Sequence, residues 1–382
     1  QATANPISFE TQGPVDLTPV MRFAEAATTR TWNGTGVWTD ASKWTPKGNI
    51  PGPGDDVVIA GGVCSVSNRL AVKSLAVTGG KLQVGAQGDV NAELAVAGDV
   101  TLSGGATTLG RVKTMTGHAA LSAGGDLRLS NAATLTVCGG PIEGEFTFAS
   151  GASSVTVGGT FALGGTSVFY PESDYLTGGS VKTVAKAFEL GATATVNASE
   201  RGWRWIDGDT PPDAPGIGFS YNVAGSYGGV GGGNSAGSAY GQKLAPVHPG
   251  SPNGNYSNGY KPAGGLVRIH ARTMRIDGSV LADANTSQGY GGASGGGIWL
   301  TADSFDFAET AKFSATGGNS GNGQHAYWSQ GGGGRIAIET GLTDGQFARL
   351  LETGKIGRKA YGEETFTNRF SGVTVDVGGG YE

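Results

Sequence analysis

The sequence predicts an all-β protein built as a parallel β-helix, a solenoid in which short strands stack coil upon coil. Short segments with alternating apolar residues recur along the chain, runs of glycine separate them, and helix signals are scarce. Alternation with a period of two is typical of strands that bury one face. Recurrence at an imperfect period of about 20 to 50 residues is typical of repeat architectures.

The clearest repeats lie in residues 264–340. Glycine runs open into Val267-Arg268-Ile269, Ile298-Trp299-Leu300 and Ile336-Ala337-Ile338. The first two triplets start 31 residues apart (298 − 267) and the next two 38 apart (336 − 298). We therefore expect a β-helix section over 264–340, with glycine at its corners.

Composition narrows the class of protein. The 382 residues include 71 glycines but no strict Gly-X-Y period, which excludes collagen. The net charge is −5 without a basic cluster, which argues against nucleic acid as a partner. No apolar run reaches about 18 residues, so no membrane span is expected. The start at Gln1 suggests a secreted form that has lost its signal peptide, although an artificially chosen start would look the same.

The first 30 residues form an expected N-terminal arm. They are polar, carry Pro6, Pro14 and Pro19, and show no period. Such an arm could lie along the body or add a strand to a neighbouring subunit. A loosely ordered terminus is the alternative.

Residues 31–56 read as a cap on the solenoid. Trp32, Trp38 and Trp44 are spaced six apart between turn residues. An uncapped solenoid end exposes strand edges and core, so large aromatic side chains suit this position. A platform that stacks on sugars is the alternative.

Residues 57–206 are expected to form a first β-helix section. A unit of glycine followed by an alternating strand starts at Gly98, Gly125 and Gly159, at spacings of 27 (125 − 98) and 34 (159 − 125). Cys64 and Cys138 are 74 residues apart (138 − 64). A disulfide between them would require a fold-back, so two buried thiols within strands are the simpler expectation.

Residues 207–263 interrupt this rhythm with a long Gly-rich loop insert. A segment of this length without an apolar period is usually a functional loop or a disordered one. Tyrosines set among glycine and serine make adaptable contact surfaces, although they could equally pin the insert to the solenoid wall. Candidate carbohydrate or partner contacts are Tyr227, Tyr240, Tyr256 and Tyr260, together with Trp299 and Trp328.

The densest group of carboxylates lies at the start of the insert. Asp207, Asp209 and Asp213 fall within seven residues, and oxygen-rich loops of this kind can hold calcium. The spacing does not follow the EF-hand pattern, and a solvated turn is the alternative. Calcium is the only cofactor that the sequence suggests.

The tail over residues 341–382 is expected to hold one short helix and a terminal strand. Thr343 can cap the helix and Gly354 can end it. Alternation resumes over 370–377, which predicts the last strand.

Two groups of motifs resemble a known sequence type. The first is Trp-Asn-Gly, Trp-x-Asp-x-x-x-Trp and Pro-Gly-x-Gly-Asp-Asp-Val-x-Ile within residues 32–59. The second is Gly-Gly-x-Ser-Gly-Gly-Gly-Ile-Trp-Leu (291–300) and Gly-Gly-Gly-Gly-Arg-Ile-Ala-Ile (331–338). They resemble Gly-rich, right-handed parallel β-helix segments of large secreted bacterial surface proteins. The resemblance covers roughly residues 31–100 and 200–340, implies an extracellular surface or matrix protein, and carries no catalytic residues.

Signals for catalysis are few. The chain has four histidines and no HExxH or CxxC motif. His270 with Lys261, Tyr327 and Arg335 could build a polysaccharide lyase site, which needs a base and a cation that neutralises a uronate. No catalytic residue is assigned.

The sequence is therefore compatible with two functions from different classes. We favour an extracellular structural or adhesive protein, an adhesin-like rod at the cell surface that associates with itself into filaments or a surface layer, or binds surface glycans. The low charge and the stiff repeat favour it. The alternative is a carbohydrate-active enzyme, a lyase or glycosidase, or a carbohydrate-binding module.

Overall fold

The structure is a computed structural model that confirms the predicted all-β class. It describes residues 28–86, 91–111, 116–142, 153–206, 212–218, 223–233, 235–243, 245–254, 261–285, 291–319, 330–341 and 373–379. These residues contain 23 strands and a single 3-10 turn, η1 (Ala41–Lys43). The short helix expected after Thr343 lies outside the described residues.

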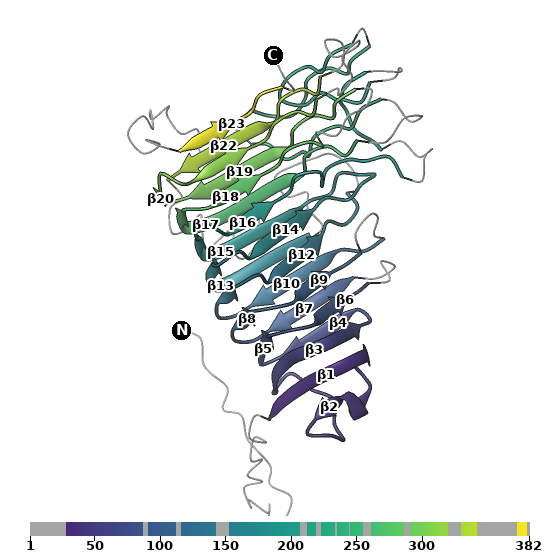
Figure 1. Cartoon of the computed structure of the whole chain (residues 1–382), viewed down its shortest axis with the longest axis vertical. Coiled ribbons are helices and arrows are strands. Elements are labelled where there is room, and N and C mark those ends of the chain that lie inside the picture. The colour runs from purple at the N-terminus through teal and green to yellow at the C-terminus, as the bar shows by residue number, and fades with distance from the viewer. Residues whose placement is uncertain are drawn as a thin grey trace, which may run out of the picture.

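The strands form a parallel β-helix with three ladders, named here ladder 1, ladder 2 and ladder 3 in the order in which the chain visits them (Figure 1). Ladder 1 contains β5 (Ser74–Val77), β8 (Val100–Leu102), β11 (Leu127–Leu129) and β20 (Ser304–Phe307). Ladder 2 contains β6 (Lys81–Val84), β9 (Ala106–Leu109), β12 (Thr134–Cys138), β14 (Val168–Glu172), β16 (Thr195–Asn197), β18 (Ser279–Leu281), β21 (Lys312–Ser314) and β23 (Thr374–Asp376). Ladder 3 contains β4 (Arg69–Val72), β7 (Ala92–Val96), β10 (Ala119–Ala123), β19 (Gly297–Ala302) and β22 (Arg335–Thr340).

Five long strands bend around a corner and so join two ladders. Ladders 1 and 2 share β1 (Thr29–Val37) and β3 (Asp56–Val66), whereas ladders 3 and 1 share β13 (Ser153–Leu163), β15 (Val181–Leu190) and β17 (Leu266–Ile276). Among the described strands, the pairing of β2 (Trp44–Thr45) with β1 is antiparallel, and every other pairing is parallel.

The stacking continues directly across the insert. Val184 of β15 pairs with His270 of β17, although 86 residues separate them (270 − 184). The two β-helix sections expected from the sequence are therefore consecutive coils of one solenoid. Figure 1 shows this continuity as an unbroken rise from β1 to β23.

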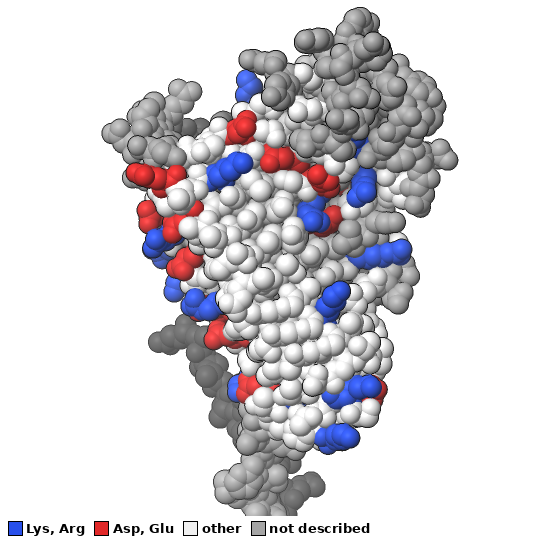
Figure 2. Space-filling view, in the orientation of Figure 1, with Lys and Arg blue, Asp and Glu red and all other residues white. Residues whose placement is uncertain are grey.

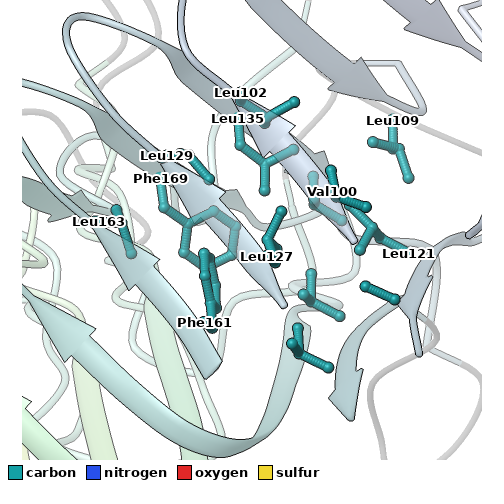
Figure 3. Close-up of a cluster of buried hydrophobic side chains, with 14 of the residues drawn as sticks. Val100, Leu102, Leu109, Leu121, Leu127, Leu129, Leu135, Phe161, Leu163 and Phe169 are labelled. Atoms are coloured by element: carbon teal, nitrogen blue, oxygen red, sulfur yellow. The ribbon is translucent and has the colours of Figure 1, made fainter. Parts of the chain in front are cut away.

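Apolar side chains from all three ladders meet in a continuous narrow core. Leu121, Leu127 and Leu135, one from each ladder, are buried and converge in Figure 3. Phe161 packs edge-to-face with Phe169 at 5.3 Å and with Phe188 at 5.5 Å between ring centroids. Alternation places every second residue of each strand in this core, which is why the period of two predicted it.

The corner between ladders 1 and 2 needs one residue with positive φ in each of several successive coils. Gly62, Gly80, Gly105, Asn131 and Gly165 occupy this corner with φ between +54° and +70°. Glycine adopts this conformation without steric cost, and asparagine tolerates it better than most residues do. Asn131 also donates its side-chain N–H to the carbonyl of Ser103, 2.9 Å away, and so links two coils.

Aspartates bind neighbouring coils at the corner before ladder 1. The carboxylate of Asp99 accepts the amide N–H of Asp126 at 2.8 Å, and that of Asp126 accepts the amide N–H of Thr160 at 2.7 Å. The bond from Thr160 is the main reason why the pKa of Asp126 is lowered. The recurring Gly-Asp pair in the sequence thus marks a hydrogen-bonded corner.

The tryptophans at the N-terminal end pack as the expected cap. Trp32 and Trp44 are fully buried, Trp38 is 7% exposed, and all three belong to the main apolar core. Ring centroids lie 5.1 Å apart for Trp32 and Trp44 and 4.5 Å for Trp38 and Trp44. Buried indoles seal the end of the core and leave no exposed platform for sugar.

Both cysteines are free and buried, as expected from their spacing. Cys64 lies within β3 and Cys138 ends β12, and burial raises the pKa of the Cys64 thiol to about 12. Both thiols therefore stay protonated near neutral pH. In the described part of the chain, no helix is long and apolar enough to cross a membrane.

The column of positive-φ residues yields a first testable expectation. A Cβ atom on Gly80 would lie 2.5 Å from the carbonyl oxygen of Gly62, and an L-residue in this conformation costs about 1–2 kcal/mol by itself. Gly80→Ala should lower the free energy of unfolding by at least about 1 kcal/mol. Gly54→Ala, where a Cβ meets nothing within 4 Å, is the matched control. Equal urea midpoints for the two variants would contradict this account of the corner.

Candidate functional site

The long excursions of the upper coils all leave the solenoid at the corner between ladders 2 and 3. They comprise residues 198–265 between β16 and β17, 282–296 between β18 and β19, and 315–334 between β21 and β22. Figure 1 shows their described parts gathered on one side of the upper end. The candidate site is built from these excursions and from the strands that they cover.

Glycine-rich segments of the excursions form a bundle of main chains, which we call the glycine bundle. Its described parts are 223–233, 247–254, 261–265, 291–296, 315–319 and 330–334, and none of them contains a strand. Their N–H and C=O groups bond from segment to segment. The described parts of the insert expected as a loop are therefore packed, and main-chain hydrogen bonds hold them in place.

Segment 291–296 lies at the centre of the glycine bundle. Four of its residues, Gly292, Ala293, Ser294 and Gly295, bond through their main chains to four different segments. The bonds are Gly225 N–H to Gly292 C=O (2.9 Å), Gly318 N–H to Ala293 C=O (2.8 Å), Ser294 N–H to Ser251 C=O (2.9 Å) and Gly295 N–H to Gly332 C=O (3.0 Å). A β-strand bonds in two opposite directions only, whereas bonds that rotate from residue to residue fit a threefold extended helix of the polyproline II type.

This packing requires glycine, because the main chains lie too close for side chains. A Cβ on Gly292 would overlap the carbonyl oxygen of Gly318, and one on Gly331 would overlap that of Ala293. The abundance of glycine in the excursions thus reflects contact between backbones in several directions.

The excursions also cover the outer face of ladder 3. Val267, Ile269 and Ala271 of β17 point into the core, so Arg268 and His270 between them point outward. Both are nevertheless buried, with exposed fractions of 1% and 0%. Residues that would face solvent on an ordinary solenoid are interior residues here.

Apolar residues of the insert form the cover. Ala245 and Val247 pack with Trp299 of β19 and Ala337 of β22 in a small second core. The ring of Trp299 meets that of His270 edge-on, with centroids 5.2 Å apart. Trp299, predicted as a contact for carbohydrate or a partner, is only 2% exposed and faces this interior.

Burial sets the charge state of this face. It lowers the pKa of the Arg268 guanidinium to about 10, which still leaves it charged at neutral pH. Burial is also the main cause that lowers the pKa of His270, helped by the positive charges of Arg268 and Lys182. His270 is therefore neutral at pH 7.

Tyr227 and Tyr240 hold the insert together. Their ring centroids lie 4.8 Å apart, and the guanidinium of Arg335 lies 5.5 Å from the Tyr227 ring and donates to the carbonyl of Tyr240 at 2.8 Å. The hydroxyl of Tyr240 donates to the carbonyl of Pro249 at 2.8 Å. This geometry matches tyrosines that pin the insert to the wall, and Tyr227 has no exposed surface.

His248 completes the aromatic group around Tyr240. Their ring centroids are 5.5 Å apart, in an edge-on arrangement, and Trp203 lies 6.0 Å from Tyr240. Burial, together with the nearby positive charge of Arg335, lowers the pKa of His248 to about 4.

A second polar group was not anticipated from the sequence. Glu172, at the end of β14, is 2% exposed and forms an ion pair with Arg201. The hydroxyl of Tyr175 donates to Glu172 Oε1 at 2.9 Å, and the guanidinium of Arg201 lies over the ring of Tyr170 at 4.2 Å. No motif or spacing in the sequence links Glu172 to Arg201.

Several candidate residues lie outside the described part of the chain, and their roles stay predictions. These are Tyr256, Tyr260, Tyr327, Trp328, Asp207 and Asp209. Asp213 is described and exposed, and its amide donates to the carbonyl of Leu176 at 2.9 Å. The described residues contain no group of three or more His, Cys, Asp or Glu placed to hold a metal, and calcium binding stays a prediction.

The described groups considered for a lyase site, His270, Lys261 and Arg335, do not share an open groove. His270 is fully buried, and Lys261 is 2% exposed with a pKa lowered by burial. Arg335 is engaged by the carbonyl of Tyr240. No protein-family model, curated protein or solved structure matches this chain.

The buried ion pair leads to a second testable expectation. Arg201→Ala would leave the Glu172 carboxylate buried without its cation, which typically costs about 3–5 kcal/mol. Arg275→Ala removes the exposed pair with Asp277 and should leave stability nearly unchanged. Urea denaturation of both variants at pH 7 checks this, and a similar midpoint for both would contradict a structural role for the Glu172 ion pair.

His248 predicts how stability depends on pH. Its pKa in the folded protein, about 4, is below the unfolded value near 6.5. Between these values the unfolded chain binds more protons, so stability falls as the pH drops from about 6.5 to 4. In His248→Gln, the loss of Tm between pH 7 and pH 4.5 should be smaller than in the wild type. His118→Gln, at a residue outside this group, is the control, and an unchanged loss in His248→Gln would contradict the expectation.

Proposed function

We propose that the chain is an extracellular structural or adhesive rod that associates with copies of itself. The observation that carries this proposal is the ladder of parallel pairings from β1 to β23, which continues across the insert. Coils joined by main-chain hydrogen bonds and one shared core make a stiff element whose length follows from the number of repeats.

The distribution of charge supports a mechanical role. Figure 2 shows a broad uncharged surface over the lower and middle coils, with Lys, Arg, Asp and Glu mostly toward its edges. In the described residues, Arg268, His270 and Glu172 are buried and engaged in packing the excursions onto the solenoid. These ionisable side chains, which could otherwise serve catalysis, therefore stabilise the architecture.

An extracellular location is part of the same proposal. It is supported by the resemblance of the Trp-rich entry and the Gly-rich repeats to secreted bacterial surface proteins. Surface glycans are a second class of partner within this role, with Tyr256, Tyr260 and Trp328 as the remaining candidate contacts.

The alternative of a carbohydrate-active enzyme or binding module requires cations and aromatic rings on one open face. Tyr227, Trp299 and His270 are covered in the structure, which favours the structural role. Incubation with a panel of uronate polysaccharides tests the alternative, because lyase products absorb ultraviolet light. Accumulation of such a product with the wild type and not with a heat-denatured sample would establish the enzyme.

Self-association gives a prediction that electron microscopy can check. The purified protein at micromolar concentration should form chains or filaments. A variant that lacks residues 1–27 keeps β1 intact and should form fewer of them if the arm donates a strand to the next copy. Chains that persist in this variant would indicate stacking of solenoid ends. Isolated particles in both samples would contradict self-assembly.

A further inference from the structure

A groove lies at the C-terminal end of the glycine bundle. Its volume is about 530 Å³, and its walls are residues 228–232 and 330–334, with Val377 and Gly379 beside them. Nine of its twelve lining residues are glycine, and none of the twelve carries a charge. The groove is therefore lined mainly by peptide groups.

The walls are held in place by hydrogen bonds to each other. The amides of Gly228 and Gly229 both donate to the carbonyl of Gly333, at 2.9 and 3.1 Å, and Gly232 donates to Gln330 at 2.8 Å. Within the described residues, the amide N–H groups of Gly333 and Gly379 have no acceptor. The groove therefore has free N–H donors among its lining residues, and hydrogen bonds between its walls hold it in a fixed shape.

The interior of the glycine bundle shows what such a surface binds. Segment 291–296 fills the corresponding space one layer deeper, between 223–233 on one side and 330–334 on another, and bonds to both through its main chain. Its residues are Gly-Gly-Ala-Ser-Gly-Gly. The neighbours leave no room for a Cβ at Gly292 or Gly295, so the occupant of such a space must be glycine-rich.

The rim of the groove adds apolar surface. Val230 and Val377 line the groove and have exposed fractions of 65% and 45%. Val375 in β23, two residues before Val377, is 51% exposed, and these are three of the five large apolar side chains exposed among the described residues. Val37 and Ile50 are the other two and belong to the N-terminal end. An uncharged groove with an apolar rim suits a neutral peptide segment and disfavours an acidic one.

We propose that this groove binds an extended, glycine-rich segment of a second polypeptide, which continues the glycine bundle by main-chain hydrogen bonds. The binding mode is the counterpart of strand addition to a sheet edge, with a threefold helix in place of a strand. The inference rests on the proposed role as a structural rod, because it assigns a partner to one end of that rod.

The test uses the full chain labelled with 15N-glycine and the peptide Gly-Gly-Ala-Ser-Gly-Gly-Gly, which copies residues 291–297. Amide signals of glycines in 228–232 and 331–334 should shift on titration, while those of Gly52 and Gly54 at the opposite end should not. A peptide with valine at the second and fifth positions should cause no shift, because it cannot enter between the walls. Unchanged wild-type spectra up to about 10 mM peptide, where affinity would be below about 3 kcal/mol, overturn the proposal.

Gly229→Val is the matched blocking variant. A Cβ at Gly229 comes no closer than 3.4 Å to the N atom of Gly333, which is an ordinary contact, and we expect the two methyl groups of valine to occupy the groove. This variant should keep the wild-type Tm and lose the peptide-induced shifts. Gly54→Val, where a Cβ meets nothing within 4 Å, should keep both. Equal shifts in Gly229→Val and the wild type would overturn the proposal.

A second variant serves if Gly229→Val proves unstable. Val377→Lys places a charge at the exposed rim and should weaken peptide binding at least several-fold, whereas Val37→Lys at the other end should not. Unchanged binding in Val377→Lys would overturn the proposal. Filaments without peptide binding would contradict the binding groove and leave the proposed structural role intact. Peptide binding without filaments would support the groove and contradict self-association.

Discussion

Hydrogen bonding between main chains of neighbouring coils is the interaction on which this structure depends. In the solenoid it runs along one axis, from β1 through every coil to β23, and the side chains fill the space inside. In the glycine bundle it runs in several directions at once, and small side chains such as those of Ser251 and Ser294 join it. In both regions the backbone N–H and C=O groups find hydrogen-bond partners, but in different geometries. The glycine content of a segment decides which geometry it adopts.

Ionisable side chains are buried on the outer face of ladder 3 because the insert covers that face. Where the insert lies against ladder 3, outward residues such as Arg268 and His270 of β17 and Trp299 of β19 become interior, whatever their polarity. Arg268 remains charged there, while His270 is neutral at pH 7 because burial and two positive neighbours oppose a second charge. The docked insert therefore depends on neutral histidines, which links the stability of the upper end to pH through packing.

The sequence predicted those parts of the fold that leave a periodic or chemical signature. Alternating triplets predicted the strands, the resemblance of the entry segment with Trp32, Trp38 and Trp44 predicted the cap, and the separation of the cysteines predicted free thiols. The glycine bundle left no such signature, because a threefold backbone lattice has no apolar period to detect. The ion pair of Glu172 with Arg201 was equally invisible, since its partners come from different coils and 29 residues separate them (201 − 172).

The two ends of the rod differ in a way that follows from their chemistry. At the N-terminal end, buried indoles of Trp32 and Trp44 cover the core, and β2 closes over β1 in the antiparallel direction. At the other end, Val375 and Val377 are exposed beside a groove of peptide groups. Because the segments of the glycine bundle form hydrogen bonds in several directions, its outermost segment still presents N–H and C=O groups that can bind a further segment. The N-terminal end of the described structure is therefore covered by buried side chains, whereas the opposite end presents peptide groups, and this difference gives the rod a direction.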